Sequence, residues 1–425
     1  MRKIISLFLV ISLSTTMVFA SGNSEKEASK TSSNDETVSV MIWDPNQEAG
    51  IKEILADFTT ETGIKTDIQI VSWNEYWTLL EASAKSNDLP DVFWMHANSA
   101  LKYMENDLLL DVTDKIAQSD KIDINNYYED ITELYSLDGK NYALPKDIDT
   151  IALWYNKTYF DEAGLAYPTD DWTWDDLIEN AKKLTKSDGS IYGFTLKNDN
   201  GQGGWFNMIN DANGYVISDD KKSSGLDDPK TLKGMETVQK LLDAKVMPSQ
   251  EIMSETEADV LLGSGKVAMA TFGSWMLSAF KQNEYISQNC DVARLPKDAT
   301  TGRQSSVYNG LGWAISANTP REDSAWKVVE YLSTKEAQIK QANLGVTMSA
   351  YKGTSDGWVN CAPNFNLQAY IDMQDDMVMF PNSKSGVKWN NAIYDCMKEA
   401  WMGQITVEEA CIKGANEMNA IIAEE

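Results

Sequence analysis

The sequence predicts an α/β protein made of two domains, and three observations lead to this prediction. The chain has 425 residues, which is more than a single hydrophobic core usually supports. Strand and helix patterns alternate along its first ordered region, as in a parallel sheet with helical crossovers. A further apolar strand pattern, at residues 267–272, recurs far downstream and suggests a second sheet.

The first domain is predicted from three strand patterns with a helix pattern in each interval. The strand patterns occupy residues 38–43, 66–71 and 91–95. The first helix carries apolar residues at i, i+3, i+4 and i+7, the spacing of one buried helical face, at Ile51, Ile54, Leu55 and Phe58. Gly63 suits the end of that helix, and residues 75–85 form the second one.

Ligands of parallel sheets bind beyond the carboxyl ends of the strands. Three loops are therefore expected to point at one crevice. They contain Trp43-Asp44, Ser72-Trp73 and the run from Met95 to Asn98.

The middle of the chain begins the second domain. Residues 142–149 lead into an apolar strand at 151–155. Thr173 and Asp176 form a capping box that predicts the start of a helix. The glycine-rich stretch 201–205 is interpreted as a binding loop rather than a plain surface turn. It is not a phosphate loop, because no Gly-Lys-Ser/Thr sequence follows it.

The second half of the chain adds one strand end and two helix starts to the prediction. Strand 267–272 turns at Gly273, which should direct Trp275 into a crevice by the same rule. Capping boxes at Thr319 and Thr406 predict the starts of two further helices, the second running nearly to the C-terminus.

Residues 1–20 are predicted to be an export signal. Arg2 and Lys3 precede an apolar run at 4–11, and small residues end the segment at Ala20. That run is too short to span a membrane, and no later run is longer. Residues 21–37 are polar and are expected to form a disordered linker. No cysteine follows the signal, so we expect a cleaved, unanchored protein in the periplasmic or extracellular space.

The charge and the cysteines disfavour several classes of function. Removing the two basic residues of the signal, which has no acid, takes the net charge from −27 to −29, a surface that repels nucleic acid and anionic lipid. The cysteines form no C-x-x-C pair and the chain has one histidine, so no metal site is expected. Export permits one or two disulfides, but spacing does not choose between a pairing and free thiols at Cys290, Cys361, Cys396 and Cys411.

Tryptophan is the most informative residue type. The chain has 14 tryptophans, one histidine and four arginines. Indole rings cover the C–H faces of sugars, while carboxylates and amides bond the hydroxyl edges. Anionic ligands usually recruit arginine, which is scarce here. The composition therefore favours a site for neutral polar rings and gives little equipment for catalysis.

Several stretches, in this order, resemble one known family. They are residues 90–95, 142–145, 151–157 with Thr173-Trp174, 265–269 with 273–275, and 312–316. The series is similar to the maltose-binding-like extracellular solute-binding proteins (family 1) of bacterial ABC sugar importers, over nearly the whole mature chain.

The resemblance implies a type II periplasmic-binding-protein fold. Each of two lobes would be a sheet flanked by helices, with the ligand in a cleft between them. Lobe 1 would comprise residues 38–148 and 310–355, and lobe 2 residues 149–309 and 356–425. Closure on a sugar would present a monomeric protein to a membrane permease. No cofactor and no catalytic residue are implied.

The resemblance also implies a set of ligand-binding residues. Asp149 matches the acidic ligand residue at the lobe crossover, and Trp275 matches the stacking tryptophan. Ala97 stands where maltose-type members have an acid after the histidine, which argues against maltose itself, and His96 is expected to be structural. The candidates are Asp149, Trp275, Asp44, Trp43, Asn98, Trp73, Trp205, Asn309, Gly310, Trp389 and Tyr394.

Two other functions stay open from the sequence. A glycoside hydrolase needs two carboxylates flanking the scissile bond, and the acids available are Asp44, Asp91, Asp147 and Asp149. A binder of another small solute, such as a polyamine or a glycerol phosphate ester, is the third reading. The negative charge suits a polyamine, whereas the few arginines disfavour a phosphate.

Overall fold

The computed structural model describes residues 37–197 and 201–425. The predicted export signal and nearly all of the predicted linker lie outside the described residues. No helix within the described ranges combines the length and apolarity needed to cross a lipid bilayer.

The first sheet has five strands and confirms the predicted parallel arrangement. Its order is β2 (Lys65–Ile70), β1 (Thr37–Ile42), β3 (Val92–Met95), β11 (Gly312–Ile315) and β6 (Ala143–Pro145). β1 runs parallel to both β2 and β3. β11 lies antiparallel between β3 and β6, although it comes from much later in the chain.

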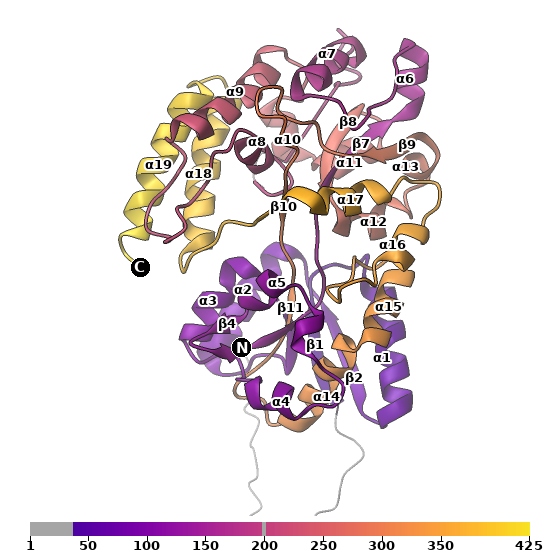
Figure 1. The fold of residues 1–425 in the computed structure, drawn as a ribbon, viewed down its shortest axis with the longest axis vertical. Helices are drawn as coiled ribbons and strands as arrows, with labels where there is room; N and C mark the ends of the chain where they lie inside the picture. The colour runs from indigo at the N-terminus through magenta and orange to yellow at the C-terminus, as the bar shows by residue number, and fades with distance from the viewer. Residues whose placement is uncertain (1–36, 198–200) are drawn as a thin grey trace, which may run out of the picture. The chain divides into compact units, whose positions relative to one another are not determined.

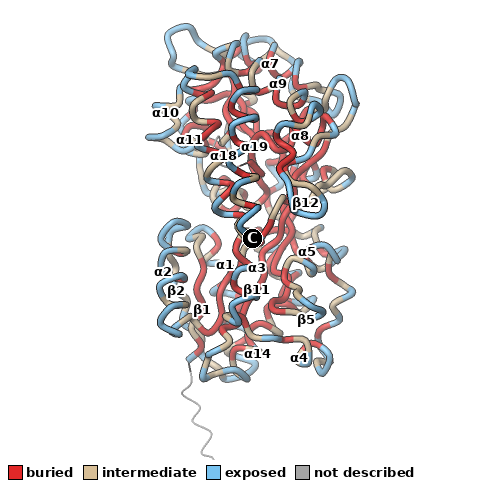
Figure 2. The backbone as a smooth tube through the Cα atoms, turned by 90° about the vertical axis from the view of Figure 1, so that its left-hand side faces the viewer, coloured by how far each residue is buried: buried red, intermediate tan, exposed pale blue. Residues whose placement is uncertain are grey.

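Helices α1 (Glu48–Thr62), α14 (Glu322–Ser333) and α15 (Lys335–Asn343) pack together beside this sheet (Figure 1). The four apolar residues predicted to form the inner face of α1 are all buried. Figure 2 shows that β1 and β11 are buried, whereas much of α2 (Trp73–Ser86) is exposed to solvent.

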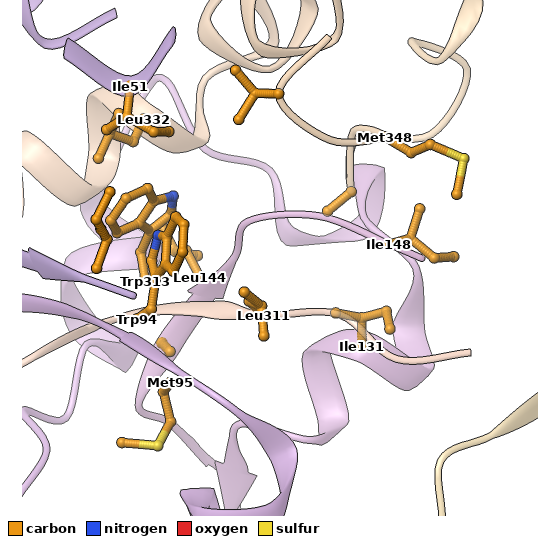
Figure 3. Packing of buried hydrophobic residues seen from close by; sticks show 14 of the residues in the cluster. Ile51, Trp94, Met95, Ile131, Leu144, Ile148, Leu311, Trp313, Leu332 and Met348 are labelled. Atoms are coloured by element: carbon orange, nitrogen blue, oxygen red, sulfur yellow. The ribbon is translucent and has the colours of Figure 1, made fainter. Parts of the chain in front are cut away.

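Large rings form the centre of the first core. Trp313 pairs across the sheet with Trp94 on one side and Leu144 on the other. The two indole centroids are 5.9 Å apart, and both side chains are fully buried. Figure 3 shows the two rings side by side next to Leu144, with Ile51 and Leu332 close to them. Such contacts add about 0.5–1.5 kcal/mol to the burial of apolar area.

The second sheet has three antiparallel strands in the order β8 (Met269–Gly273), β7 (Ile151–Asn156) and β9 (Cys290–Ala293). Both faces of β7 are buried, which explains its continuous apolar sequence. On one face Trp154 packs edge-on against Phe280 and Phe365. The other face joins a separate core that includes α18 (Gly386–Trp401) and α19 (Val407–Ile422).

The remaining elements complete the chain. The helices are α3 (Ala97–Glu105), α4 (Thr113–Gln118), α5 (Glu129–Glu133), α6 (Lys157–Ala163), α7 (Trp174–Leu184), α8 (Phe206–Asp211), α9 (Pro229–Asp243), α10 (Gln250–Glu255), α11 (Ala258–Gly263), α12 (Leu277–Phe280), α13 (Glu284–Asn289), α16 (Asp356–Asn360) and α17 (Gln368–Asp372). The short strands are β4 (Ser136–Leu137), β5 (Lys140–Asn141), β10 (Ser306–Tyr308) and β12 (Met377–Met379).

Two of the three predicted capping boxes are present. Thr173 and Thr406 each cap their helix reciprocally with the acid three residues later. The prediction at Thr319 is wrong, because α14 begins at Glu322 without a side-chain cap. The hydroxyl of Thr319 instead donates to the buried carboxylate of Asp91, which also accepts from Ser39. A buried carboxylate needs several donors, and this need outweighs the capping of an exposed helix end.

All four cysteines are free thiols, and Cys290, Cys396 and Cys411 are buried. Burial raises the pKa of Cys396 to about 11 and that of Cys411 to about 12. These thiols are therefore protonated and unreactive near neutral pH.

Asp211 is a buried carboxyl whose protonation makes the stability of the fold depend on pH. Its Oδ1 accepts from the backbone N–H and the hydroxyl of Ser305, both at 2.6 Å, and its Oδ2 accepts from Trp174 Nε1 at 2.9 Å. Burial raises the pKa of this carboxyl to about 7, although the bonds from Ser305 and Trp174 act in the opposite direction.

We expect Asp211 to make the protein less stable as pH rises from about 4 to about 7. A carboxyl whose pKa is raised by folding binds its proton more tightly in the folded state, so its contribution is complete below the unfolded value and is lost as pH passes the folded value. Between pH 5 and pH 8 the difference in unfolding free energy between wild type and Asp211→Ala should shrink by about 2–3 kcal/mol. Urea denaturation at both pH values measures this difference, and a constant difference would contradict the prediction.

Candidate functional site

The register of β7 and β8 brings the two leading candidates to one edge of the second sheet. Ile151 pairs with Gly273, and the N–H of Ser274 donates to Thr150 O at 3.0 Å. Asp149, two residues before β7, and Trp275, two residues after β8, therefore lie at the same end. A Cβ on Gly273 would come within 1.9 Å of the Trp275 ring, so the glycine makes room for the partly exposed indole.

Asp149 is buried, with only 8% of its surface exposed. Its Oδ1 accepts from the backbone N–H of Asn309 at 3.0 Å and from Gln202 Nε2. Burial, aided by the nearby carboxylate of Asp147, raises the pKa of Asp149 well above its ordinary value. Gln202 was not among the predicted residues, and the only signal for it is the glycine-rich loop that carries it.

His96 connects this edge to the first sheet. Its Nδ1 accepts from Asn98 N at 3.2 Å, and its Nε2 lies 3.0 Å from the side-chain amide of Asn309. Burial lowers the pKa of His96 to about 4, so the ring is neutral at physiological pH and carries its proton on Nε2. The amide oxygen of Asn309 accepts a hydrogen bond from this Nε2–H when the amide is turned by 180°. These contacts describe a hydrogen-bonding residue rather than a catalyst.

A series of ring contacts runs through His96 and is called the aromatic strip below; its members are Trp43, Trp73, His96, Phe380 and Phe206. The centroid distances along it are 5.0, 5.5, 6.0 and 6.1 Å. Trp73 is 43% exposed, so the strip presents an indole to solvent. Phe380 was not predicted, because nothing in its local sequence distinguishes it from a core residue.

The strip ends in rings that are buried in the second core. Trp205 is fully buried against Phe206, and Trp389 is fully buried with its indole N–H bonded to Ser383 at 2.8 Å. The hydroxyl of Tyr394 accepts from the N–H of Gly201 at 3.0 Å. All three candidates have the contacts of core residues, and their contact with a ligand stays a prediction.

Asp44 and Gly310 also have local roles. Asp44 accepts from Asn46 N and from Gln47 Nε2, both at 2.9 Å, which shapes the turn after β1. Gly310 packs against the main chain, since a Cβ there would lie 2.3 Å from Asp147 O. Ligand contacts by these two residues remain predictions.

Each carboxylate considered for a hydrolase already has protein partners. Asp147 pairs with Lys146 at 2.6 Å, Asp91 accepts from Ser39, and Asp44 and Asp149 are bonded as described above. Within residues 37–197 and 201–425, no group of three or more His, Cys, Asp or Glu side chains could hold a metal ion. The arrangement is suited to holding a neutral ligand between rings and amides.

Comparison with known proteins agrees with this description. The family model for bacterial extracellular solute-binding proteins matches residues 44–339. The chain is 25% identical over 351 residues to the galactooligosaccharide-binding protein of Bacillus subtilis, covering 79% of this chain and 78% of that protein. It is 24% identical to the multiple sugar-binding protein of Streptococcus mutans, covering 83% and 84%.

Solved structures share the fold at lower identity. An ABC substrate-binding protein from Listeria monocytogenes in complex with cycloalternan superposes with a TM-score of 0.84 at 22% identity, covering 92% of this chain and all of that one. Maltose-bound T. maritima MalE3 gives 0.76 at 19% identity, covering 91% and 99%. The predicted periplasmic-binding-protein fold is thereby confirmed.

Proposed function

Because the chain belongs to the family of bacterial extracellular solute-binding proteins, we propose that it is the extracytoplasmic binding component of an ABC importer for a neutral mono- or oligosaccharide. The names of its relatives support this proposal, since they refer to galactooligosaccharides and to multiple sugars. The protein would bind its sugar, close on it and deliver it unchanged to a membrane permease.

The observation that carries the proposal is the aromatic strip beside a buried set of amides and one carboxyl. Trp73 and Trp275 offer partly exposed indole faces for the C–H faces of a sugar ring. Asp149, Gln202 and Asn309 are buried, and Asp149 Oδ1 accepts from both Gln202 Nε2 and the backbone N–H of Asn309. A site of this kind rejects analogues that lack a hydroxyl, because its own polar groups would then lose their partners.

We propose the predicted lobe boundaries, 38–148 with 310–355 and 149–309 with 356–425, for the two closing halves. Contacts that cross between these ranges support closure. Lys384 pairs with Glu105 at 2.6 Å, and Tyr308 donates to Asp130. Separating the halves would break these contacts and open the site. Export by a cleaved N-terminal signal and a monomeric state belong to the same proposal.

Isothermal titration calorimetry with a panel of neutral sugars tests the function. The panel contains lactose, maltose, maltotetraose, N,N′-diacetylchitobiose and tagatose, with spermidine and glycerol 3-phosphate as the charged alternatives. We expect saturable binding of at least one sugar and no product after prolonged incubation. Binding of only a charged solute, or hydrolysis of any sugar, would refute the proposal.

Trp275→Ala is expected to weaken binding of the best sugar at least tenfold without unfolding the protein. The indole supplies a flat apolar face, and its loss removes both buried area and a ring contact. The measurement is the dissociation constant, with the melting temperature recorded alongside. Trp326→Ala removes a similarly half-buried indole on α14 and should leave binding unchanged. An unchanged constant for Trp275→Ala would remove this residue from the site.

A further inference from the structure

The glycine-rich stretch 201–205, called the glycine loop below, is buried along its whole length. Its main chain is tied to two neighbouring elements. The hydroxyl of Thr271, on β8, donates to Gly203 O at 2.6 Å. The N–H of Gly201 donates to the hydroxyl of Tyr394, on α18, at 3.0 Å. The glycine loop is therefore a fixed part of the second core.

Asn207, the second residue of α8, binds the glycine loop and β10 at the same time. Its Nδ2 donates to Gln202 O at 2.8 Å and to Gly204 O at 2.9 Å. Its Oδ1 accepts from the N–H of Val307 at 2.8 Å. Two carbonyl oxygens at one end and an N–H at the other fix the orientation of this amide. The side chain is fully buried, and both of its donor hydrogens are used.

These contacts close a ring of hydrogen bonds and main chain, called the Asp149 ring below; its members are Asp149, Gln202, Asn207, Val307 and Asn309. Asp149 Oδ1 accepts from Gln202 Nε2 and from Asn309 N. Gln202 is held by Asn207 through its own carbonyl oxygen, and Asn309 follows Val307 by two residues. Asn207 is the link opposite Asp149, so it sets the separation of the two groups that donate to one carboxyl oxygen.

The composition of the glycine loop explains why such a link is needed. Three of its five residues are glycines, and glycine loses more conformational freedom on ordering than any other residue. Without the two bonds from Asn207, the main chain at Gln202 would adopt other conformations and its amide would leave Asp149. A site whose polar groups are already in place binds more tightly, because the ligand does not have to order them.

We propose that Asn207 is a positioning residue for sugar binding, which holds Gln202 and Asn309 against Asp149 and does not itself touch the ligand. The inference rests on the proposed function and goes beyond it, because it assigns part of the affinity to a residue that the sugar does not reach. The burial of Asn207 and its three hydrogen bonds to main chain support this indirect role.

The alternative is that Asn207 only stabilises the packing around α8. Its effect on the dissociation constant would then be the same whether or not Gln202 is present. A positioning role depends on Gln202, because a ring that is already open leaves Asn207 little to position. A double-mutant cycle measures this dependence.

The test combines Asn207→Ala and Gln202→Ala, singly and together, in the otherwise unchanged protein. The probe is whichever of the five neutral sugars above the wild type binds most tightly, and calorimetry gives its dissociation constant. We expect each single variant to raise this constant about tenfold. In the Gln202→Ala protein, Asn207→Ala should raise it by a further factor of about two or less. An equal factor in both backgrounds would overturn the positioning role.

Asn156→Ala is the matched control. Asn156 is also fully buried in the second domain, where its Nδ2 donates to the hydroxyl of Tyr285 at 2.8 Å and its Oδ1 accepts from Tyr159 N at 3.2 Å. Both alanine variants should unfold at lower urea concentrations than wild type, but only Asn207→Ala should weaken sugar binding. An equal loss of affinity in Asn156→Ala would assign the effect to general destabilisation and overturn the inference.

Asn207→Asp provides a second variant that keeps the size of the side chain. The introduced carboxyl group can still accept from Val307 N. It offers at most one hydrogen, and only when protonated, to Gln202 O and Gly204 O. We expect a loss of affinity similar to that of Asn207→Ala, and wild-type affinity in this variant would overturn the inference.

The outcomes separate this inference from the proposed function. Unchanged dissociation constants in Asn207→Ala and Asn207→Asp, with weaker binding by Trp275→Ala, overturn the role of Asn207 and leave sugar binding intact. Unchanged affinity in Gln202→Ala removes the contact that Asn207 is proposed to position and also overturns it. Failure of the wild type to bind any of the five sugars overturns the proposed function and this inference together.

Discussion

Replacement of Asp147 by Asn is expected to lower the free energy of unfolding by about 3–5 kcal/mol. Lys146 is fully buried, and its Nζ lies 2.6 Å from Asp147 Oδ2 and 3.0 Å from Gln47 Oε1. The same ammonium stands 4.5 Å from the centre of the Trp94 ring. Asparagine can still accept from Leu311 N, which donates to Asp147 Oδ1 at 2.7 Å. The substitution therefore removes the negative charge and leaves the lysine buried without a counter-ion.

Urea denaturation measures the loss, and two control proteins locate its cause. The double variant Lys146→Met with Asp147→Asn removes both charges and should recover much of the lost stability. Glu179→Gln breaks an exposed pair with Lys182 and should change stability by about 0.5 kcal/mol or less. A loss below about 1 kcal/mol for Asp147→Asn, or no recovery in the double variant, would contradict a buried ion pair.

The strands of the first sheet were predictable because their signals are local. β1, β2 and β3 are apolar or alternating runs separated by a helix whose buried face follows the 3.6-residue period. The insertion of β11 between β3 and β6 could not be predicted in this way. The pairing of Trp313 with Trp94 depends on residues far apart in the chain, and no periodicity in either strand specifies its partner.

The candidate site was predictable where a residue follows a strand end. Trp275 and the loop of Asn98 were predicted from strand geometry and from the family resemblance, whereas Asp149 was predicted from the resemblance alone. Trp389 illustrates the limit of such reasoning, because its helix could present either face to the site until the packing of α18 is known. That packing buries the indole and places Gly386, at the start of the same helix, against Asn98 of α3.

Residues outside regular elements were the hardest to predict. Gln202 and Phe380 reach the site from loops, where no period assigns a side chain to a face. Thr319 shows that a local motif can also mislead. Thr319 and Glu322 have the spacing of a capping box, yet the Thr319 hydroxyl donates to the buried carboxylate of Asp91 instead of capping the helix.

Gly310→Ala is expected to destabilise the protein by about 2–4 kcal/mol and to weaken sugar binding. A Cβ at this position would lie 2.3 Å from Asp147 O, and 2.8 Å from Ile131. The first contact is with main chain that is fixed on both sides, by the Asp147–Lys146 ion pair and by the bridge between Asp149 and Asn309. The Ile131 contact is with a side chain that can rotate, but the Asp147 carbonyl oxygen cannot move in this way, so that strain must spread along the backbone.

A backbone shift at Gly310 would affect binding as well as stability. Displacing Gly310 shifts Asn309, whose N–H donates to Asp149 Oδ1 and whose amide faces His96. For Gly310→Ala, the free energy of unfolding measured by denaturation should therefore fall and the dissociation constant measured by calorimetry should rise. Gly203→Ala, with open space around its Cβ, should leave the free energy of unfolding unchanged. If Gly310→Ala keeps its stability and loses only affinity, the space at Gly310 is needed by the ligand and not by the Asp147 main chain. The predicted ligand contact at Gly310 would then explain the glycine better than backbone packing does.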